Sequence, residues 1–217
     1  MLLTRHKPTN RLRKQEWVVD TLALGQASDL IREHHYSGGN ANTATFRHGL
    51  FRKEEWPFVY SGAALWMPPT SDAAKANWTG DWNRVLVLSR LVVTPDVPTN
   101  GASFLISRSI KMIEQTGNWD ALLTYADEWQ GHTGAIYLAT GWTYAGKTKP
   151  ERTYVKDGVM VARKRGPRTF THQEMLDRGS TCIGSFSRHR FVKKLRSAKD
   201  GDIKMAELSH PSRVGTP

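Results

Sequence analysis

A run of three residues, His34, His35 and Tyr36, stands at the expected end of an amphipathic helix and could take part in chemistry. Histidine and tyrosine can bind a metal ion, and their rings can stack against a nucleobase flipped out of a duplex. One of the histidines continues the apolar face that Leu30 and Ile31 begin, so it could instead pack in the core. The pattern leaves a functional and a structural role open.

Arg90 interrupts the apolar run of residues 84–93, which is expected to be a strand. An arginine is seldom buried without a partner, and Asp127, at the end of the next expected strand, could provide one. Sites of α/β proteins open at the carboxyl ends of strands, where Asp127 stands. A carboxylate there could orient or deprotonate an amine, although a structural salt bridge or a helix cap would explain the same residues.

A loop of small residues, Thr99 to Ser103, precedes a segment with helical apolar spacing at residues 104–116. The free N–H groups and the dipole at the start of such a helix bind phosphate. An ordinary turn from a strand to a helix has a similar composition. The loop alone therefore does not decide between a cofactor site and a plain connection.

Positive charge dominates the composition and is concentrated near both ends. The 217 residues carry a formal net charge of +11, with a pI near 9.9. A basic surface attracts nucleic acid first and an anionic membrane second, and the interleaved Phe186 and Phe191 suit phosphate contact with stacking. Two solvated ends would carry the same charge. The basic residues are Arg5, Lys7, Arg11, Arg13 and Lys14, and then Arg188, Arg190, Lys193, Lys194, Arg196 and Lys199.

The elements that must position these residues alternate between strands and helices. This order predicts an α/β layer fold, with a mixed central sheet flanked by helices. Thr171 and Glu174 form a capping-box pattern that should open a short helix, and the residues after that helix are expected to be a basic tail. Strands are expected at residues 16–21, 57–67, 84–93, 121–126 and 142–145, helices at 28–35, 104–116 and 133–140, and a β-hairpin at 152–163 with Asp157-Gly158 as its turn.

Length and composition favour a single domain at residues 15–199, between a basic arm at 1–14 and a disordered tail at 200–217. No apolar run reaches the roughly 18–20 residues of a membrane span, and the amino end lacks the apolar centre of a signal peptide. A cytoplasmic protein without a membrane partner is therefore expected. The single cysteine, Cys182, excludes an intramolecular disulfide and an all-cysteine zinc cluster.

Six segments, in order over roughly residues 30–195, carry a family resemblance: HHYSGG, LSRLVV, NGASFLISRSI, TYAD, GHTGAIYLATGWTYAG and SRHRFVKKL. In these segments the chain resembles the Mom proteins, the adenine-modification enzymes of phage and prophage. The resemblance implies a fold related to the GNAT acetyltransferases, with a C-terminal β-hairpin and a basic tail in this chain. It also implies conversion of adenine in double-stranded DNA to N6-carbamoylmethyladenine, which shields phage DNA from host restriction.

The same resemblance implies acetyl-CoA as cofactor and a dependence on iron (Fe2+), for which His35 and Tyr36 are the metal candidates. Glu16 is the nearest counterpart of a family glutamate near the first strand. The family's functional positions fall on His35, Tyr36, Arg90, Ser103, Asp127 and Tyr137, with cofactor contacts at Val92, Asn100, Gly101, Ala102, Ser103 and Tyr137, and DNA contacts at His35, Tyr36, Arg188, Arg190 and Lys193.

The adenine N6 amine lies within a stacked duplex, so the base must be flipped out before it can react. Trp66, Trp142 and Tyr144 are candidate walls for such a base. Two other functions fit the same residues: an N-acetyltransferase of the GNAT type acting on a protein or small-molecule amine, and a non-enzymatic basic DNA-binding protein. The sequence leaves open whether the protein is a monomer or a homodimer.

Overall fold

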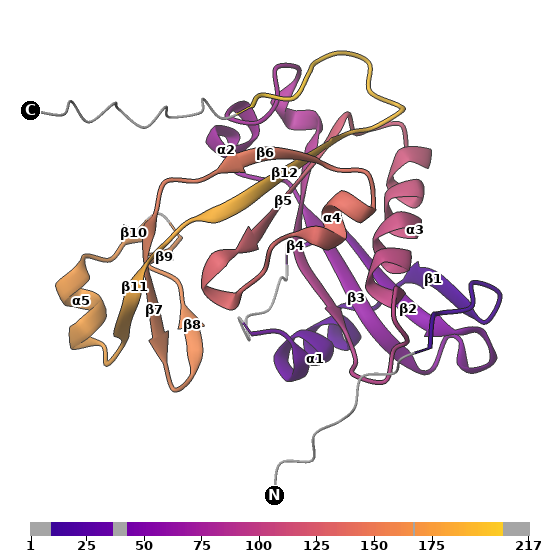
Figure 1. Ribbon diagram of the computed structural model, residues 1–217, viewed down its shortest axis with the longest axis horizontal. Coiled ribbons are helices and arrows are strands. Elements are labelled where there is room, and N and C mark those ends of the chain that lie inside the picture. The colour runs from indigo at the N-terminus through magenta and orange to yellow at the C-terminus, as the bar shows by residue number, and fades with distance from the viewer. Residues whose placement is uncertain (1–9, 37–42, 167, 206–217) are drawn as a thin grey trace, which may run out of the picture.

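The computed structural model describes residues 10–36, 43–166 and 168–205, and its centre is a seven-stranded sheet (Figure 1). The strands lie in the order β1-β2-β3-β4-β5-β12-β6, and only β4 and β5 among these neighbours are parallel. This confirms the predicted mixed α/β sheet. The strands are β1 (Trp17–Thr21), β2 (Phe46–Arg52), β3 (Tyr60–Met67), β4 (Val85–Val93), β5 (Ala121–Asp127), β12 (Arg188–Lys194) and β6 (Thr143–Lys147).

Helices cover both faces of this sheet. On one face, called the α3 face, α3 (Gly101–Gln115) and α4 (Ala135–Ala139) pack against Leu86, Leu88 and Leu122. The opposite face, called the α1 face, is covered by α1 (Leu24–His34) beside β2 and β3 and by α2 (Ser71–Lys75) beside the start of β4. Leu105 and Ile106 of α3 are completely buried, and each such side chain contributes about 1.5–3 kcal/mol of hydrophobic stabilisation.

The alternation of side chains between the two faces of β4 is interrupted at Ser89. The neighbours of Arg90 and Leu88 on β3 are consecutive residues, Leu65 and Trp66, so Ser89 is an extra residue in β4. Leu88 therefore faces the α3 side, whereas Arg90 faces the α1 side together with the residues that pack against α1. The bulge sets the direction of the charged side chain in this strand.

The parallel pairing between β4 and β5 is short. It joins Val85–Val87 to Ala121–Leu123, and the Thr124 hydroxyl then donates to the Leu88 carbonyl at 3.3 Å. Beyond this point no ladder pair joins the two strands in the described part of the chain. A gap therefore opens between the carboxyl ends of β4 and β5.

A small module of residues 148–187 stands beside the central sheet (Figure 1). Its core is Tyr154, Phe170 and Met175, with Val161 and Cys182 packed against them. The expected hairpin is confirmed, with a turn at Asp157–Gly158 where both residues have positive φ. The expected capping box at Thr171 is confirmed as well. The module contains β7 (Glu151–Lys156), β8 (Val159–Val161), β9 (Lys164–Arg165), β10 (Arg168–Thr169), α5 (His172–Asp177) and β11 (Thr181–Phe186).

The expectation of a basic tail after α5 is wrong. Residues 181–186 form a strand of the module, and residues 188–194 form β12, which lies between β5 and β6 in the central sheet. Charged side chains are tolerated in this interior strand because one face of β12 is only partly covered by other elements. Farther on, Ile203 pairs with Trp78 and Lys204 N–H donates to the Asn77 carbonyl at 3.0 Å.

The expected basic arm is described only from residue 10 onward. There Leu12 N–H donates to the Thr99 carbonyl at 3.0 Å, and Thr99 N–H donates to the Asn10 carbonyl at 3.0 Å. This pairing lays the start of the described chain along the loop before α3. Among the described residues, no helix combines the length and the apolar character needed to span a membrane.

Candidate active site

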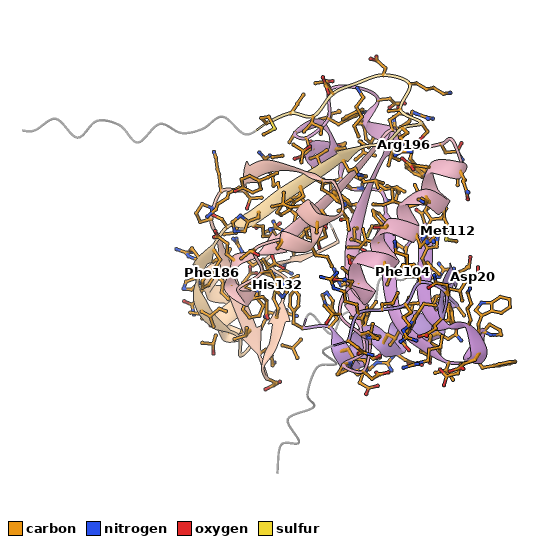
Figure 2. The ribbon with its side chains drawn as sticks, turned by 45° about the vertical axis from the view of Figure 1, so that its right-hand side comes forward. Asp20, Phe104, Met112, His132, Phe186 and Arg196 are labelled. Carbon is orange, nitrogen blue, oxygen red and sulfur yellow. The ribbon has the colours of Figure 1, made fainter. Side chains whose placement is uncertain are left out.

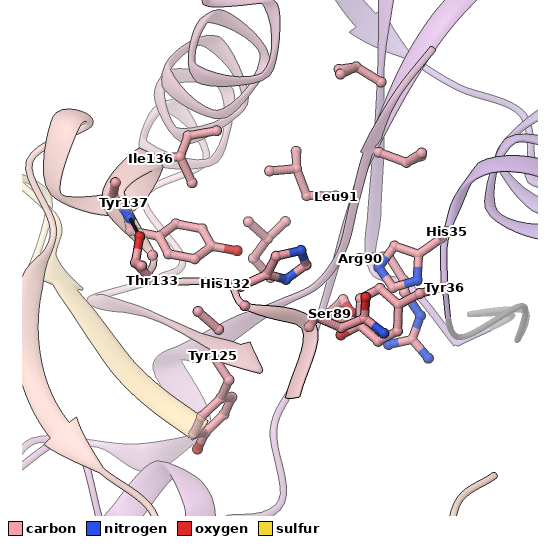
Figure 3. Close-up of a pocket in the computed structure, with 18 of the residues that line it drawn as sticks. His35, Tyr36, Ser89, Arg90, Leu91, Tyr125, His132, Thr133, Ile136 and Tyr137 are labelled. Atoms are coloured by element: carbon pink, nitrogen blue, oxygen red, sulfur yellow. Dashed lines mark hydrogen bonds between the residues drawn. The ribbon is translucent and has the colours of Figure 1, made fainter. Parts of the chain in front are cut away.

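A cleft of about 660 Å³ occupies the gap between the carboxyl ends of β4 and β5 (Figure 3). Ile136 and Tyr137 reach it from α4 on the α3 face, whereas Tyr36, Arg90 and Tyr125 belong to the α1 face. Side chains from both faces of the sheet therefore contribute to the lining. The segments that line it are residues 34–36, 88–93, 125–126 and 130–137.

Tyr36 and Asp127 form a hydrogen bond at this cleft, in which the Tyr36 hydroxyl donates to Asp127 Oδ2. Helix α1 ends at His34, and the extended backbone of His35 carries Tyr36 toward the end of β5. Burial, together with the Asp127 carboxylate, raises the pKa of Tyr36 well above its usual range. The proton therefore stays on the phenol, and the carboxylate of Asp127 is held in a fixed place.

Two histidines lie beside this pair. The ring of His35 stacks on Tyr36 with centroids 4.4 Å apart, and burial, helped by the charge of Arg90, lowers its pKa to about 4. His35 is therefore neutral at pH 7. The ring of His132 meets Tyr36 edge to face at 5.8 Å, on the loop before α4 (Figures 2 and 3). Sequence reasoning did not select His132, although a histidine among glycines just after a strand end was an available signal.

Arg90 lies in the cleft but does not form the expected pair with Asp127. In the described residues no ion pair joins them. Asp127 instead accepts a hydrogen bond from the Tyr36 hydroxyl, and Arg90 Nη1 donates to the Ser89 carbonyl at 2.7 Å. The extra residue at Ser89 gives this part of β4 a local geometry that the strand pattern did not anticipate. Nε of Arg90 is buried without a hydrogen-bond partner among the described residues.

Tyr137 enters the cleft from α4, and its hydroxyl points into the open space near His132 (Figure 3). Its ring packs on Phe191 and Trp142, with centroids 5.2 and 5.7 Å away. Burial raises the pKa of Tyr137, so its phenol keeps a proton that it can donate. Helix α4 can lie this close to β12 because Gly134 has no side chain; a Cβ there would come within 2.2 Å of the Phe191 ring.

The predicted phosphate loop forms the amino end of α3, outside the cleft lining. Asn100 adopts the left-handed conformation with φ of 72°, and Gly101 lies so close to Val97 that a Cβ would come within 2.1 Å of Val97 Cγ1. Ala102 and Ser103 follow in the first turn, and the Ser103 hydroxyl donates to the Asn100 carbonyl at 2.9 Å. The predicted cofactor contact in β4, Val92, lines the cleft itself.

The three predicted DNA contacts of β12 face different ways. Lys193 lies on the α3 face, where its Nζ donates to the carbonyls of Thr140 and Gly141 at 3.3 and 2.8 Å and so caps α4. Arg188 and Arg190 alternate with it and lie on the α1 face. Lys193 therefore holds the end of a helix, whereas Arg188 and Arg190 lie opposite Asp127 and Tyr125 on the α1 face.

The three aromatic residues expected to wall a flipped base do not line the cleft. Trp66 and Trp142 are buried in the core and stack on each other at 6.3 Å, and the Trp66 indole donates to Ser109 Oγ at 2.6 Å. Tyr144 lies on β6, with its hydroxyl 3.3 Å from His189 Nδ1. The aromatic rings that do line the cleft are those of His34, His35, Tyr36, Tyr125, His132 and Tyr137.

The residues present do not fit an iron site. Within the described ranges, no three side chains of His, Cys, Asp or Glu come together in a way that could hold a metal ion. Tyr36 donates its proton to Asp127, so it is not available as a phenolate ligand. Glu16, the nearest counterpart of the family glutamate, pairs with Arg13 at 3.4 Å and lines a separate hollow on β1 and β2.

Comparison with known proteins agrees with this architecture. The structure of the acetyltransferase yncA from Salmonella typhimurium with its cofactor acetyl-CoA has a TM-score of 0.53 and 10% identity, over 86% of this chain and 98% of its own. The ribosomal-protein-S5-alanine acetyltransferase from Vibrio fischeri has a TM-score of 0.53 and 9% identity, over 88% of this chain and 100% of its own.

The spermidine N-acetyltransferase from Vibrio cholerae, in complex with CoA and spermine, has a TM-score of 0.51 and 10% identity, over 84% of this chain and 97% of its own. At these identities the likeness establishes the fold, which is that of the GNAT acetyltransferases. A search of curated protein sequences finds no match. The model of the Mom protein family matches residues 16–212, which is most of the sequence, and the chain therefore belongs to the Mom protein family.

Proposed function

We propose that the protein is a transferase that modifies the N6 amine of adenine in double-stranded DNA, and that the group it adds is carbamoylmethyl. Membership of the Mom family supports the choice of reaction. The observation that carries the proposal is the cleft between β4 and β5, which Tyr36 and Tyr137 line and beside which Asp127 accepts the hydrogen bond of Tyr36. Such a modification would shield phage DNA from host restriction.

Acetyl-CoA is the proposed cofactor, and the chain offers it a fitting place. Beyond Leu88, no strand of the described chain pairs with the edge of β4 that faces β5, and Val92 on this stretch lines the cleft, where its backbone could bind the cofactor. The loop of residues 100–103 would hold the phosphates at the start of α3. When bound, acetyl-CoA would supply a two-carbon unit as an activated thioester. The carbamoylmethyl product would also take a two-electron oxidant, to join the methyl carbon to N6, and an ammonia-level nitrogen donor, to form the amide. The Salmonella neighbour, which holds acetyl-CoA, supports this assignment.

Asp127 is the proposed base or orienting group for the amine. The N6 lone pair is delocalised into the adenine ring, so a carboxylate that accepts one N–H of the amine makes the nitrogen more nucleophilic. Tyr36 fixes the direction of that carboxylate by donating to Oδ2, which leaves Oδ1 for the amine. His35 is neutral and stacked on Tyr36, so it adds an aromatic edge without adding charge.

Tyr137 is the proposed acid on the other side of the cleft. Its phenol is protonated because burial raises its pKa, and it points into the cleft from the α3 face. A proton held on this oxygen could pass to the CoA sulfur when the nitrogen donor breaks the thioester. Asp127 and Tyr137 thus divide base and acid between the two faces of the sheet. Arg90 adds a positive charge on the α1 side.

Double-stranded DNA is the proposed partner, and charge supports it. The chain has 31 lysines and arginines against 20 acids, an excess that favours a polyanion. Flipping takes the target base out of the stack, and the cleft opens next to two arginines of β12 on the α1 face. A small-molecule amine would not need this charge.

The decisive experiment is mass spectrometry of nucleosides from the DNA of cells that express the protein. We expect an adenosine species heavier by a carbamoylmethyl group, which Asp127→Asn abolishes and Lys111→Gln, an exposed change on α3, preserves. Unmodified adenosine throughout would overturn the proposal in favour of an N-acetyltransferase acting on another amine. If Asp127→Asn still binds DNA but modifies none, a purely DNA-binding role is eliminated.

A further inference from the structure

We propose that Arg90, Arg188 and Arg190, together with Tyr125, form a surface on the α1 face that receives the phosphodiester backbone of the DNA strand carrying the acceptor base. These four residues are called the arginine patch below. The inference rests on the proposed function for its choice of DNA. It adds the direction of approach, with DNA on the α1 face and the cofactor loop on the α3 face.

The strands place the patch directly beside the candidate base. In the antiparallel ladder between β12 and β5, Arg188 lies opposite Asp127 and Arg190 lies opposite Tyr125. Side chains of directly opposed residues project to the same face, so all four of these project from the α1 face. Arg90 and Tyr125 also line the cleft. The patch therefore lies next to Asp127 on the α1 face.

Aromatic and backbone contacts hold the patch in place. The Arg188 guanidinium lies 5.2 Å from the centroid of the Tyr125 ring, and Arg190 Nη2 donates to the Ala145 carbonyl at 2.8 Å. A guanidinium has five N–H donors, and these contacts use few of them. Nε of Arg90 and of Arg190 is buried with no hydrogen-bond partner in the described ranges. The arginines are thus oriented, and because these Nε atoms are buried, a phosphate would be bound through Nη donors.

The patch keeps its positive charge. The carboxylate that pairs with Arg188 is Glu151, at 3.4 Å, and its side chain is 72% exposed, so solvent and salt weaken the pair. Arg90 donates to a backbone carbonyl and not to an acid. Asp127, opposite Arg188 on the same face, offsets one of the three positive charges. The remaining positive charge suits phosphate oxygens, which accept bidentate hydrogen bonds from arginine.

The cofactor also carries phosphates, so the source of the phosphate must be decided. The loop that would hold the cofactor precedes α3, which packs on the other face of the sheet. Arg188 and Arg190 lie on the α1 face, across the sheet from that helix. We therefore assign the patch to DNA, and the cofactor is the competing source that the experiment separates.

The test uses the full-length protein and a labelled DNA duplex, with binding followed by fluorescence anisotropy over a range of salt concentrations. Arg188→Gln should weaken binding several-fold and reduce the slope of log K against log salt by about one, since one phosphate contact is lost. Lys111→Gln removes the same charge from the exposed side of α3 and should leave the slope unchanged. Arg188→Lys, which retains the charge, should retain the slope.

The outcomes separate this inference from the proposed function. An unchanged slope for Arg188→Gln, with tight binding by the parent protein, would overturn the patch and leave the proposed function intact. Absence of DNA binding by the parent would overturn both. Affinity for CoA, measured by calorimetry, should be equal for the parent and Arg188→Gln. A loss of CoA affinity would assign the patch to the cofactor and refute the inference, and a lowered slope for Arg188→Lys would contradict it as well.

Discussion

His48 should make the stability of this protein strongly dependent on pH. It is 3% exposed on β2, and its Nδ1 contacts Ser109 Oγ of α3, which also accepts the indole N–H of Trp66. Burial outweighs the opposing effect of Asp20 and lowers the pKa of His48 from 6.5 to about 4. The folded protein therefore keeps His48 neutral over a range in which the unfolded chain takes up a proton.

The sign and the size of the effect follow from linkage. Because the pKa is lowered on folding, the contribution of His48 is complete above pH 6.5 and is lost as the pH falls toward 4. A shift of one unit corresponds to about 1.4 kcal/mol, so the free energy of unfolding should fall by about 3 kcal/mol over this range through His48 alone. His35, with its pKa also near 4, contributes in the same direction.

The assay is urea unfolding, followed by tryptophan fluorescence at several pH values between 4.5 and 7. His48→Asn should be less stable than the parent at pH 7, because it disturbs the contact with Ser109. Its stability should nevertheless change less with pH, with a slope lower by up to one proton. Parallel pH profiles for the parent and His48→Asn would refute this reasoning.

Three further predictions concern the cleft and its support. Tyr36→Phe removes the hydroxyl that donates to Asp127, and since a hydrogen bond to a charged group is worth about 1.5–3 kcal/mol, the single-turnover rate of nucleoside modification should fall roughly 10- to 150-fold; an unchanged rate would count against Asp127. Gly134→Ala places a Cβ 2.2 Å from the Phe191 ring at a positive φ, so thermal unfolding should show a loss of about 2 kcal/mol or more, and a full retention of stability would disprove the packing of α4. Lys193→Met removes the cap of α4 and should cost about 1 kcal/mol of stability, while the salt dependence of DNA binding stays at the parent value; a lower slope would show that Lys193 contacts DNA.

The main sheet could be predicted where its strands are apolar, and not where they are charged. The apolar runs at residues 84–93 and 121–126 predicted two buried strands, and the helical spacing of apolar residues after residue 104 predicted α3. β12 is also an interior strand of the sheet, between β5 and β6, yet its sequence is mostly basic and is typical of a solvated end. The sheet accommodates its cations because Lys193 caps a helix and the arginines lie on a partly covered face. Both arrangements depend on tertiary packing, which the local sequence does not reveal.

The site was predictable in its components but not in its pairing. Tyr36 and Tyr137 line one cleft, and Asp127 is joined to Tyr36 by a hydrogen bond beside it. Arg90 was assigned to Asp127 because the sequence cannot reveal the extra residue at Ser89 or the approach of Tyr36 from α1. The tryptophans were misjudged for a related reason, since composition does not tell a core ring from a ring that lines a cleft.

The contribution of both sheet faces to the cleft has a kinetic consequence. If the cofactor binds from the α3 face and the acceptor base from the α1 face, as proposed, the two do not compete for space, so both can be bound at once and neither must leave before the other arrives. The only cysteine, Cys182, is packed in the module, so the cleft has no thiol that could carry the group between two half-reactions. Initial rates measured against both reactants should give intersecting, and not parallel, double-reciprocal lines. Each product should inhibit competitively only against the reactant that binds in the same part of the cleft.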